Sequence, residues 1–188
     1  MGLLGKMPPS HEEDVGVLRA WREQCPALQE LWPLDEDVRA WEGVTFDDSG
    51  GVGRIDVIWL SAKDLTGPVP ESLGKLTFLK QLDLSDNRLT GEVPESLAKL
   101  PALKWLQLNN NELTGSVPES LGAASSLRQL ILNNNKLTGE VPASLGDLQS
   151  LTWLQLHNNR LTTIPGTLSR LLRDRDVAVH LDAGVTAV

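Results

Sequence analysis

Very few residues in this chain have the types and spacing that catalysis requires. The sequence contains no Ser/His/Asp set, no His/Cys cluster at metal-ligand spacing and no glycine-rich loop of the phosphate-binding kind. His157 stands isolated, without a partner that would make it a general base or a metal ligand. We therefore expect a protein that is not an enzyme, with no cofactor and no metal site.

The carboxylates and the thiol that could suggest chemistry have simpler interpretations. Asp83 and Asp86 resemble a carboxylate pair, but the basic residues Lys80 and Arg88 flank them, which favours surface ion pairs. Cys25 is predicted to lie on the apolar face of a helix, where a thiol is more often part of the core than a nucleophile. Because it is the single cysteine, it cannot form an intramolecular disulfide.

The net charge of -8 is concentrated in one stretch of the chain. Residues 11–48 contain 11 acidic and 3 basic residues, whereas the remainder contains 14 of each. The sequence has no basic stripe for nucleic-acid binding and no apolar run of the roughly 20 residues that membrane insertion needs. The single cysteine and the lack of an Asn-x-Ser/Thr sequon slightly favour an intracellular location, with a secreted protein or an ectodomain fragment as the alternative.

A 24-residue period dominates the sequence. Leu76, Leu100, Ala124 and Leu148 open successive units that read approximately L-x-x-L-x-x-L-x-L-x-x-N-x-L-T-G-x-V-P-x-x-L, and a partial unit precedes them. The alternating L-x-L segment predicts a short strand with one buried face. Five such strands, stacked at about 4.8 Å, would form one parallel sheet.

An asparagine follows the strand in each of the four complete units. An amide both donates and accepts hydrogen bonds, and buried backbone groups need such partners. The pattern therefore predicts an internal hydrogen-bonded ladder rather than a catalytic or glycosylation site, formed by Asn87, Asn111, Asn135 and Asn159.

The repeats resemble the plant-type leucine-rich-repeat family, which includes receptor-kinase ectodomains and polygalacturonase inhibitors, with similar arrays in algal and protist proteins. The resemblance is carried by LTGEVPESL at 89–97, LTGSVPESL at 113–121 and LTGEVPASL at 137–145. It implies an α/β fold: a right-handed, curved solenoid with a parallel sheet on its concave face. It also implies that the T-G-x-V-P segments form a second set of short strands.

A solenoid needs atypical units to cover its two apolar ends. At the N-terminal end, Ser10 is predicted to cap a helix that extends to Cys25, before Pro26. At the other end, residues 177–181 are predicted to add one parallel strand. The expected organisation is a flexible N-terminus at 1–9, an N-terminal cap at 10–53, five repeats at 54–171, and a C-terminal cap strand and tail at 172–188.

Two segments depart from the family pattern. The stretch WEGVTF at 41–46 resembles the W-x-G-V-x-C segment of plant-type caps, in which two cysteines flank the motif. Here Arg39 and Phe46 occupy those places, so the usual disulfide is absent and apolar packing is expected to replace it. In the fifth repeat, LTTIP at 161–165 lacks the glycine and is one residue shorter, which predicts a different local curvature.

Outward positions of the predicted strands form two columns that vary while the leucine framework stays constant. The first contains Val57, Gln81, Trp105, Gln129 and Trp153, and the second contains Trp59, Asp83, Gln107, Ile131 and Gln155. Exposed aromatic patches mark binding sites, although rings that lie flat on neighbouring strands fit the same pattern. Acidic residues in the early repeats and basic ones in the later repeats fit either an oriented partner or simple solvated charge.

These features predict a monomeric recognition module that binds a protein or a peptide on its concave face, as the sensor part of a longer protein in one interpretation. A carbohydrate-binding module and a structural or self-assembling repeat are the alternatives, since tryptophans also stack on sugars. The candidate binding residues are Trp59, Trp105, Trp153, Ile131, Gln107, Gln129, Gln155, Asp83, Lys104, Arg128 and His157.

Overall fold

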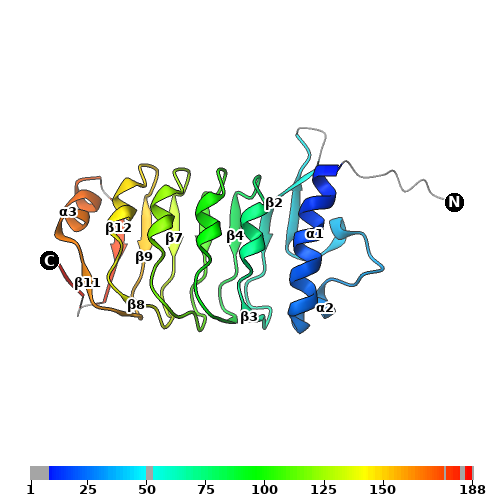
Figure 1. Cartoon of the computed structure of the whole chain (residues 1–188), viewed down its shortest axis with the longest axis horizontal. Coiled ribbons are helices and arrows are strands. Elements are labelled where there is room, and N and C mark those ends of the chain that lie inside the picture. The colour runs from blue at the N-terminus through cyan, green and yellow to red at the C-terminus, as the bar shows by residue number, and fades with distance from the viewer. Residues whose placement is uncertain (1–8, 50–52, 176, 183–184, 188) are drawn as a thin grey trace.

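Successive 24-residue units stack side by side and contribute their strands to one seven-stranded sheet (Figure 1). The computed structural model describes residues 9–49, 53–175, 177–182 and 185–187. The first strand pairs antiparallel with the second, and the others are parallel. In spatial order the strands are β1 (Val44–Asp47), β2 (Arg54–Trp59), β4 (Gln81–Asp83), β6 (Trp105–Gln107), β7 (Gln129–Ile131), β9 (Trp153–Gln155) and β12 (Ala178–His180).

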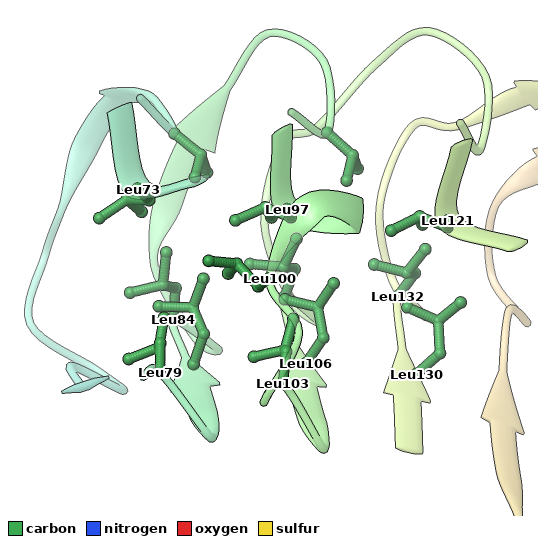
Figure 2. Packing of buried hydrophobic residues seen from close by; sticks show 14 of the residues in the cluster. Leu73, Leu79, Leu84, Leu97, Leu100, Leu103, Leu106, Leu121, Leu130 and Leu132 are labelled. Atoms are coloured by element: carbon green, nitrogen blue, oxygen red, sulfur yellow. The ribbon is translucent and has the colours of Figure 1, made fainter. Parts of the chain in front are cut away.

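The core is a column of leucines that runs the length of the array. Leu84, Leu106 and Leu130 project inward from neighbouring coils, and Leu97 and Leu121 meet them from the opposite side (Figure 2). All five are fully buried. Because each coil buries its apolar side only against its neighbours, the regular period of the sequence becomes one continuous core. The predicted leucine-rich-repeat solenoid is thereby confirmed.

The side opposite the sheet consists of short 3-10 helices, each preceded by a proline in extended conformation. These turns pack closely: a Cβ atom on Gly74 would lie 2.5 Å from the Ser96 side chain, and one on Gly122 would lie 2.4 Å from the Ser144 backbone. Glycine is therefore required at both positions. The turns are η2 (Glu71–Lys75), η3 (Glu95–Lys99), η4 (Glu119–Ala123) and η5 (Ala143–Asp147), and helix α3 (Gly166–Asp174) replaces the next one.

A second set of short strands follows the main sheet, as the family resemblance implies. Strand β3 (Thr66–Pro68) pairs with β5 (Arg88–Thr90), and β8 (Thr138–Gly139) pairs with β10 (Arg160–Leu161). The L-T-G glycines adopt φ between 76° and 81°, a region that side chains disfavour. In the fifth repeat a threonine takes that place and forms β11 (Thr163–Ile164), which pairs with β13 (Thr186–Ala187) in the C-terminal tail.

Two helices and a 3-10 turn cover the N-terminal end: α1 (Pro9–Gln24), α2 (Pro26–Leu31) and η1 (Val38–Ala40). Helix α1 begins at Pro9, so the predicted role of Ser10 as the residue before the helix is wrong. Proline favours the first helical position because its fixed φ suits the helix and its missing N–H is not needed there. Arg54 donates two hydrogen bonds, of 2.7 and 2.9 Å, to the buried Asp14 of α1, which fixes the helix on β2.

Three tryptophans form the centre of this cap. The ring of Trp32 stacks on Trp41 with centroids 5.0 Å apart and meets Trp21 edge-on at 6.1 Å. The indole N–H of Trp32 donates to the Glu42 carbonyl, and that of Trp41 donates to the Pro33 carbonyl. All three rings are almost fully buried. In Trp32 and Trp41 the fold therefore uses both the apolar ring and the indole N–H.

The two residues that replace the expected cysteines contact each other directly. The guanidinium carbon of Arg39 lies 4.9 Å from the centroid of the Phe46 ring, a cation–π arrangement. Phe46 is also partly buried against the hydrophobic core. A non-covalent contact thus joins the same two positions that the family resemblance assigns to a disulfide.

The C-terminal end is covered by α3 and β12. Strand β12 pairs parallel with β9, which confirms the strand predicted for residues 177–181. Helix α3 extends across the expected boundary after residue 171 and ends at Asp174. Val179 and Leu181 are partly buried against the core at this end.

Candidate binding face

The strand register produces the two columns of outward side chains that the sequence predicts. In the first column, position 57 pairs with 81, 81 with 105, 105 with 129 and 129 with 153. In the second column, 59 pairs with 83, 83 with 107, 107 with 131 and 131 with 155. Strand β12 extends the columns by Ala178 and His180. The leucines between the columns are fully buried, so the outward positions alone are available on this face.

Three tryptophans project from this face with different exposures. Trp59 is 60% exposed and Trp153 is 40% exposed, while Trp105 is half-buried. The Lys104 ammonium lies 6.0 Å from the centroid of the Trp105 ring, at the outer limit of a cation–π contact. The rings at the two ends of the array are therefore substantially exposed rather than covered by their neighbours.

An imidazole extends the aromatic surface beyond Trp153. The His180 ring stacks beside Trp153 with centroids 6.0 Å apart and an interplanar angle of 24°, and the His157 ring lies 6.0 Å from His180. His157 is half-buried, and its Nδ1 has no hydrogen-bond partner among the described residues. Sequence reasoning missed His180, although its place in the predicted strand 177–181 would have assigned it to the second column.

Asp83 is bound by its own chain rather than exposed for a partner. It is 6% exposed, and its Oδ1 accepts hydrogen bonds from the backbone N–H and the hydroxyl of Ser85, at 3.0 and 2.6 Å. The structure thus does not present this predicted candidate as a free carboxylate on the face. A hydroxyl two residues along the chain is the signal that could have indicated this.

The ion pairs expected between Asp83 or Asp86 and the nearby basic residues are wrong. Lys80 instead pairs with Asp47 at 2.6 Å and with Asp56 at 3.3 Å, across β1 and β2. The hydrogen bond from Lys80, followed by that from Ser49, holds the pKa of Asp47 well below its usual value. In turn, hydrogen bonds to the Asp47 and Asp56 carboxylates raise the pKa of Lys80. Lys80 thus partly neutralises one carboxylate of the cap and one of the first repeat.

The central part of the face carries amides and cations. Gln107, Gln129 and Gln155 are half-buried, as is Ile131. Lys104 and Arg128 occupy adjacent coils, since the Arg128 N–H donates to the Lys104 carbonyl at 2.8 Å. Neither cation has an ion-pair partner within the described part of the chain. This region can therefore offer amide donors and acceptors together with uncompensated positive charge.

The predicted asparagine ladder is confirmed. Asn111 Nδ2 donates to the Leu84 and Leu108 carbonyls at 2.9 and 3.1 Å, and its Oδ1 accepts from the Leu89 N–H at 2.9 Å. Asn87 makes the corresponding bonds one coil earlier. Each side chain thereby joins adjacent coils and satisfies buried backbone groups, which is a structural role.

A second ladder, which sequence reasoning missed, lies one residue before the first. Asn158 donates to the Asn134 side chain, Asn134 to Asn110, and Asn110 to the Asp86 carboxylate at 2.7 Å. All four residues adopt φ between 55° and 58°. Asn and Asp tolerate this left-handed region better than other side chains, so the consecutive asparagines after each strand were the available signal.

Other kinds of site are not formed by the described residues. Among them, no group of three or more histidine, cysteine, aspartate or glutamate side chains is arranged to hold a metal ion. None of the helices described is both long and apolar enough to cross a membrane.

The leucine-rich-repeat family model matches residues 57–113, 77–137 and 125–173, which together cover more than half of the chain. The chain belongs to the leucine-rich-repeat family. Phytosulfokine receptor 2 of Arabidopsis thaliana is 36% identical over 81 residues, a region that is 42% of this leucine-rich-repeat chain and 8% of that receptor. The chain therefore spans less than a tenth of the length of the curated relative it matches.

Two solved structures of plant receptors are also similar to this leucine-rich-repeat protein. The BIR3–SERK2 complex from Arabidopsis thaliana matches with a TM-score of 0.76 and 31% identity, over 93% of this chain and 98% of that one. The ectodomain of the Arabidopsis receptor kinase HAESA in complex with an IDA peptide hormone matches with a TM-score of 0.65 and 31% identity, over 95% and 34%. These likenesses confirm the plant-type resemblance. The slight preference for an intracellular location finds no support, because the HAESA structure is that of a receptor-kinase ectodomain.

Proposed function

We propose that this chain is a recognition module that binds a protein or peptide partner on the concave face of its sheet. The observation that carries the proposal is the set of outward tryptophan rings, two of them at least 40% exposed, on a rigid parallel sheet. Buried aromatic residues dominate the energy of many interfaces, and an exposed ring on a preorganised surface can be buried without a large loss of entropy.

Two likenesses support a peptide or protein partner. HAESA, a structural neighbour, binds a peptide hormone, and BIR3, another, forms a complex with SERK2. We infer that this chain acts in the same class of recognition, as a monomer and within a longer receptor-like protein. Amides between the rings would hydrogen-bond the backbone of such a partner, whereas Lys104 and Arg128 would orient it by charge.

Selection from a random peptide display library tests the proposal directly. The library is selected on the full chain and counter-selected on the double variant Trp105→Ala/Trp153→Ala, with Leu34→Ala as a matched control. Leu34 is 64% exposed in the N-terminal cap, outside the sheet. We expect enriched peptides that bind the wild type and Leu34→Ala equally and the double variant at least about thirtyfold more weakly.

Enrichment that is equal on the wild type and the double variant would rule out the concave rings as the site. If no peptide is enriched and a glycan array instead gives ligands that depend on both tryptophans, the module binds carbohydrate. Circular dichroism melting of the double variant shows whether it is folded, and light scattering over a dilution series tests the monomer. A mass that rises with concentration would favour a self-assembling repeat.

A further inference from the structure

The spacing of two outward rings, one half-buried and one exposed, defines a periodicity that a ligand must match. Trp105 and Trp153 occupy the same column, with Gln129 paired between them. Two strand spacings of about 4.8 Å place their Cα atoms roughly 9.6 Å apart. A polyproline II helix rises 3.1 Å per residue with three residues per turn, so its side chains return to the same face about every 9.3 Å. The Cα spacing of the two tryptophans and the length of one polyproline II turn agree to within a few tenths of an ångström.

Other regular peptide conformations fit this column less well. A β-strand returns to the same face every second residue, at about 6.7 Å, and so places no side chain at the second ring. An α-helix comes near the distance at i and i+7, roughly 10.5 Å, but its intervening i+3 and i+4 residues would press on Gln129. The backbone groups of an α-helix are already hydrogen-bonded within the helix. The Gln129 amide would therefore be desolvated without gaining a hydrogen-bond partner.

The groups between the rings suit a polyproline II backbone. Gln81 and Gln129 alternate with the two tryptophans in the column, and both amides are half-buried and therefore accessible. In polyproline II the peptide carbonyls form no internal hydrogen bonds and remain available to donors such as a glutamine amide. Aromatic rings that bind proline and donors that bind the neighbouring carbonyls are the combination that proline-rich segments dock on.

Charge next to the column selects among such segments. Lys104 and Arg128 immediately precede the strand positions Trp105 and Gln129, and neither forms an ion pair within the described residues. A polyproline II segment with its first and fourth residues on the rings directs the intervening side chains sideways. An acidic residue at one of those positions would therefore face the two cations.

We propose that the column from Gln81 to Trp153 binds a polyproline II segment of the form Pro-x-x-Pro with an acidic intervening residue, its prolines on Trp105 and Trp153. This inference rests on the proposed function and specifies its ligand class. The segment lies across the strands, and its preformed conformation limits the entropy lost on binding.

Peptides that differ only in spacing test the inference on the unaltered protein. The probes are fluorescein-labelled peptides with the cores Pro-Glu-Ala-Pro and Pro-Ala-Glu-Pro, flanked by identical Gly/Ser segments. Controls of matched composition place the prolines at i and i+2 or i and i+4. We expect at least one of the first two cores to bind about tenfold more tightly than either control, as measured by fluorescence anisotropy. Equal affinity for all four would overturn the inference, because charge or composition alone would then explain binding.

Variants of the chain test the assignment of each contact. Trp105→Ala and Trp153→Ala should each weaken the best peptide by at least about tenfold, and Lys104→Gln/Arg128→Gln should remove the preference for the acidic residue. Leu34→Ala should bind as the wild type does. Unchanged affinity in both single tryptophan variants would place the peptide elsewhere and overturn the inference, independently of how the charge variant behaves.

Failure of this inference can be distinguished from failure of the proposed function. If the display library yields tryptophan-dependent peptides that lack prolines at i and i+3, the recognition function stands and the polyproline II ligand is wrong. The library could instead yield no tryptophan-dependent peptide, while a β-linked glucose oligosaccharide quenches tryptophan fluorescence in the wild type but not in the double variant. In that case both the polyproline II ligand and the proposed protein or peptide recognition are wrong.

Discussion

The six tryptophans divide into two groups that the same protein uses in opposite ways. Trp21, Trp32 and Trp41 in the N-terminal cap are at most 2% exposed, and they contact one another as rings. Trp59, Trp105 and Trp153 lie on outward positions of separate strands, and Trp59 and Trp153 are 60% and 40% exposed. The residue type alone therefore does not indicate a role.

The difference between the groups comes from the number of elements that surround each ring. In the cap, helices α1 and α2, turn η1 and the first strands enclose the rings on every side. On the sheet, each ring projects from one face and has only neighbouring side chains around it. The comparison predicts that the cap rings stabilise the fold and that the sheet rings contribute little to its stability, a distinction that substitution can test.

The largest expected effect is that of Trp32→Ala in the cap. It removes a fully buried ring, its stack on Trp41 and a hydrogen bond to Glu42, so we expect the free energy of unfolding to fall by about 3 to 5 kcal/mol. Urea denaturation followed by circular dichroism measures this, with Trp153→Ala as the control. A loss no greater than that of the control would abolish the distinction between the two groups.

A framework residue of the array should show an intermediate effect. Asn111→Ala removes a buried amide, leaves the Leu89 N–H without its side-chain acceptor and takes one of two amide donors from each of the Leu84 and Leu108 carbonyls, at a cost of about 1 to 3 kcal/mol. Gln107→Ala, four residues earlier on the face, should stay within about 0.5 kcal/mol. Equal denaturation midpoints for these two variants would mean that the ladder does not support the coils.

The double variant Trp105→Ala/Trp153→Ala should retain most of its stability. Each substitution removes an outward ring and is expected to cost about 0.5 kcal/mol or less. The midpoint of thermal unfolding, compared with that of Trp32→Ala, provides the measurement. Unfolding of the double variant at room temperature would show that these rings belong to the framework, and the sheet face would lose its main support as a site.

The smallest expected effect concerns acid. Lys80 lowers the pKa of Asp47 in the folded state, so the ion pair stabilises the chain above the unfolded pKa of about 4, and this stabilisation is lost as the pH falls below it. The difference in melting temperature between the wild type and Asp47→Asn should therefore be small at neutral pH and shrink further towards pH 3. A difference that stays constant with pH would exclude the ion pair as its cause.

Periodicity made most of the fold predictable. A leucine or asparagine that recurs every 24 residues must occupy equivalent places in every coil, so the core, the strand register and the ladder of Asn111 follow from the repeat itself. The same argument assigned Trp59, Trp105 and Trp153 to outward positions. None of these conclusions depended on knowing which contacts an individual side chain makes.

The features that escaped prediction occur once or depend on side-chain direction. The ion pair between the buried Asp14 and Arg54 joins residues 40 positions apart, one of them in the non-repeating cap, where no periodicity relates them. Asp83 turns towards Ser85, which its place in the outward column does not reveal. The ladder through Asn110 depends on left-handed backbone at positions that the sequence shows only as paired asparagines.

The contact between Arg39 and Phe46 has a consequence for how the chain folds. A disulfide in this position would need an oxidant and would form by thiol exchange, over seconds to hours. Here the sole cysteine, Cys25, is buried in the cap core, and a cation on an aromatic ring joins the two positions instead. Folding of the cap therefore includes no oxidation step, and reductants will leave both its refolding rate and its melting temperature unchanged.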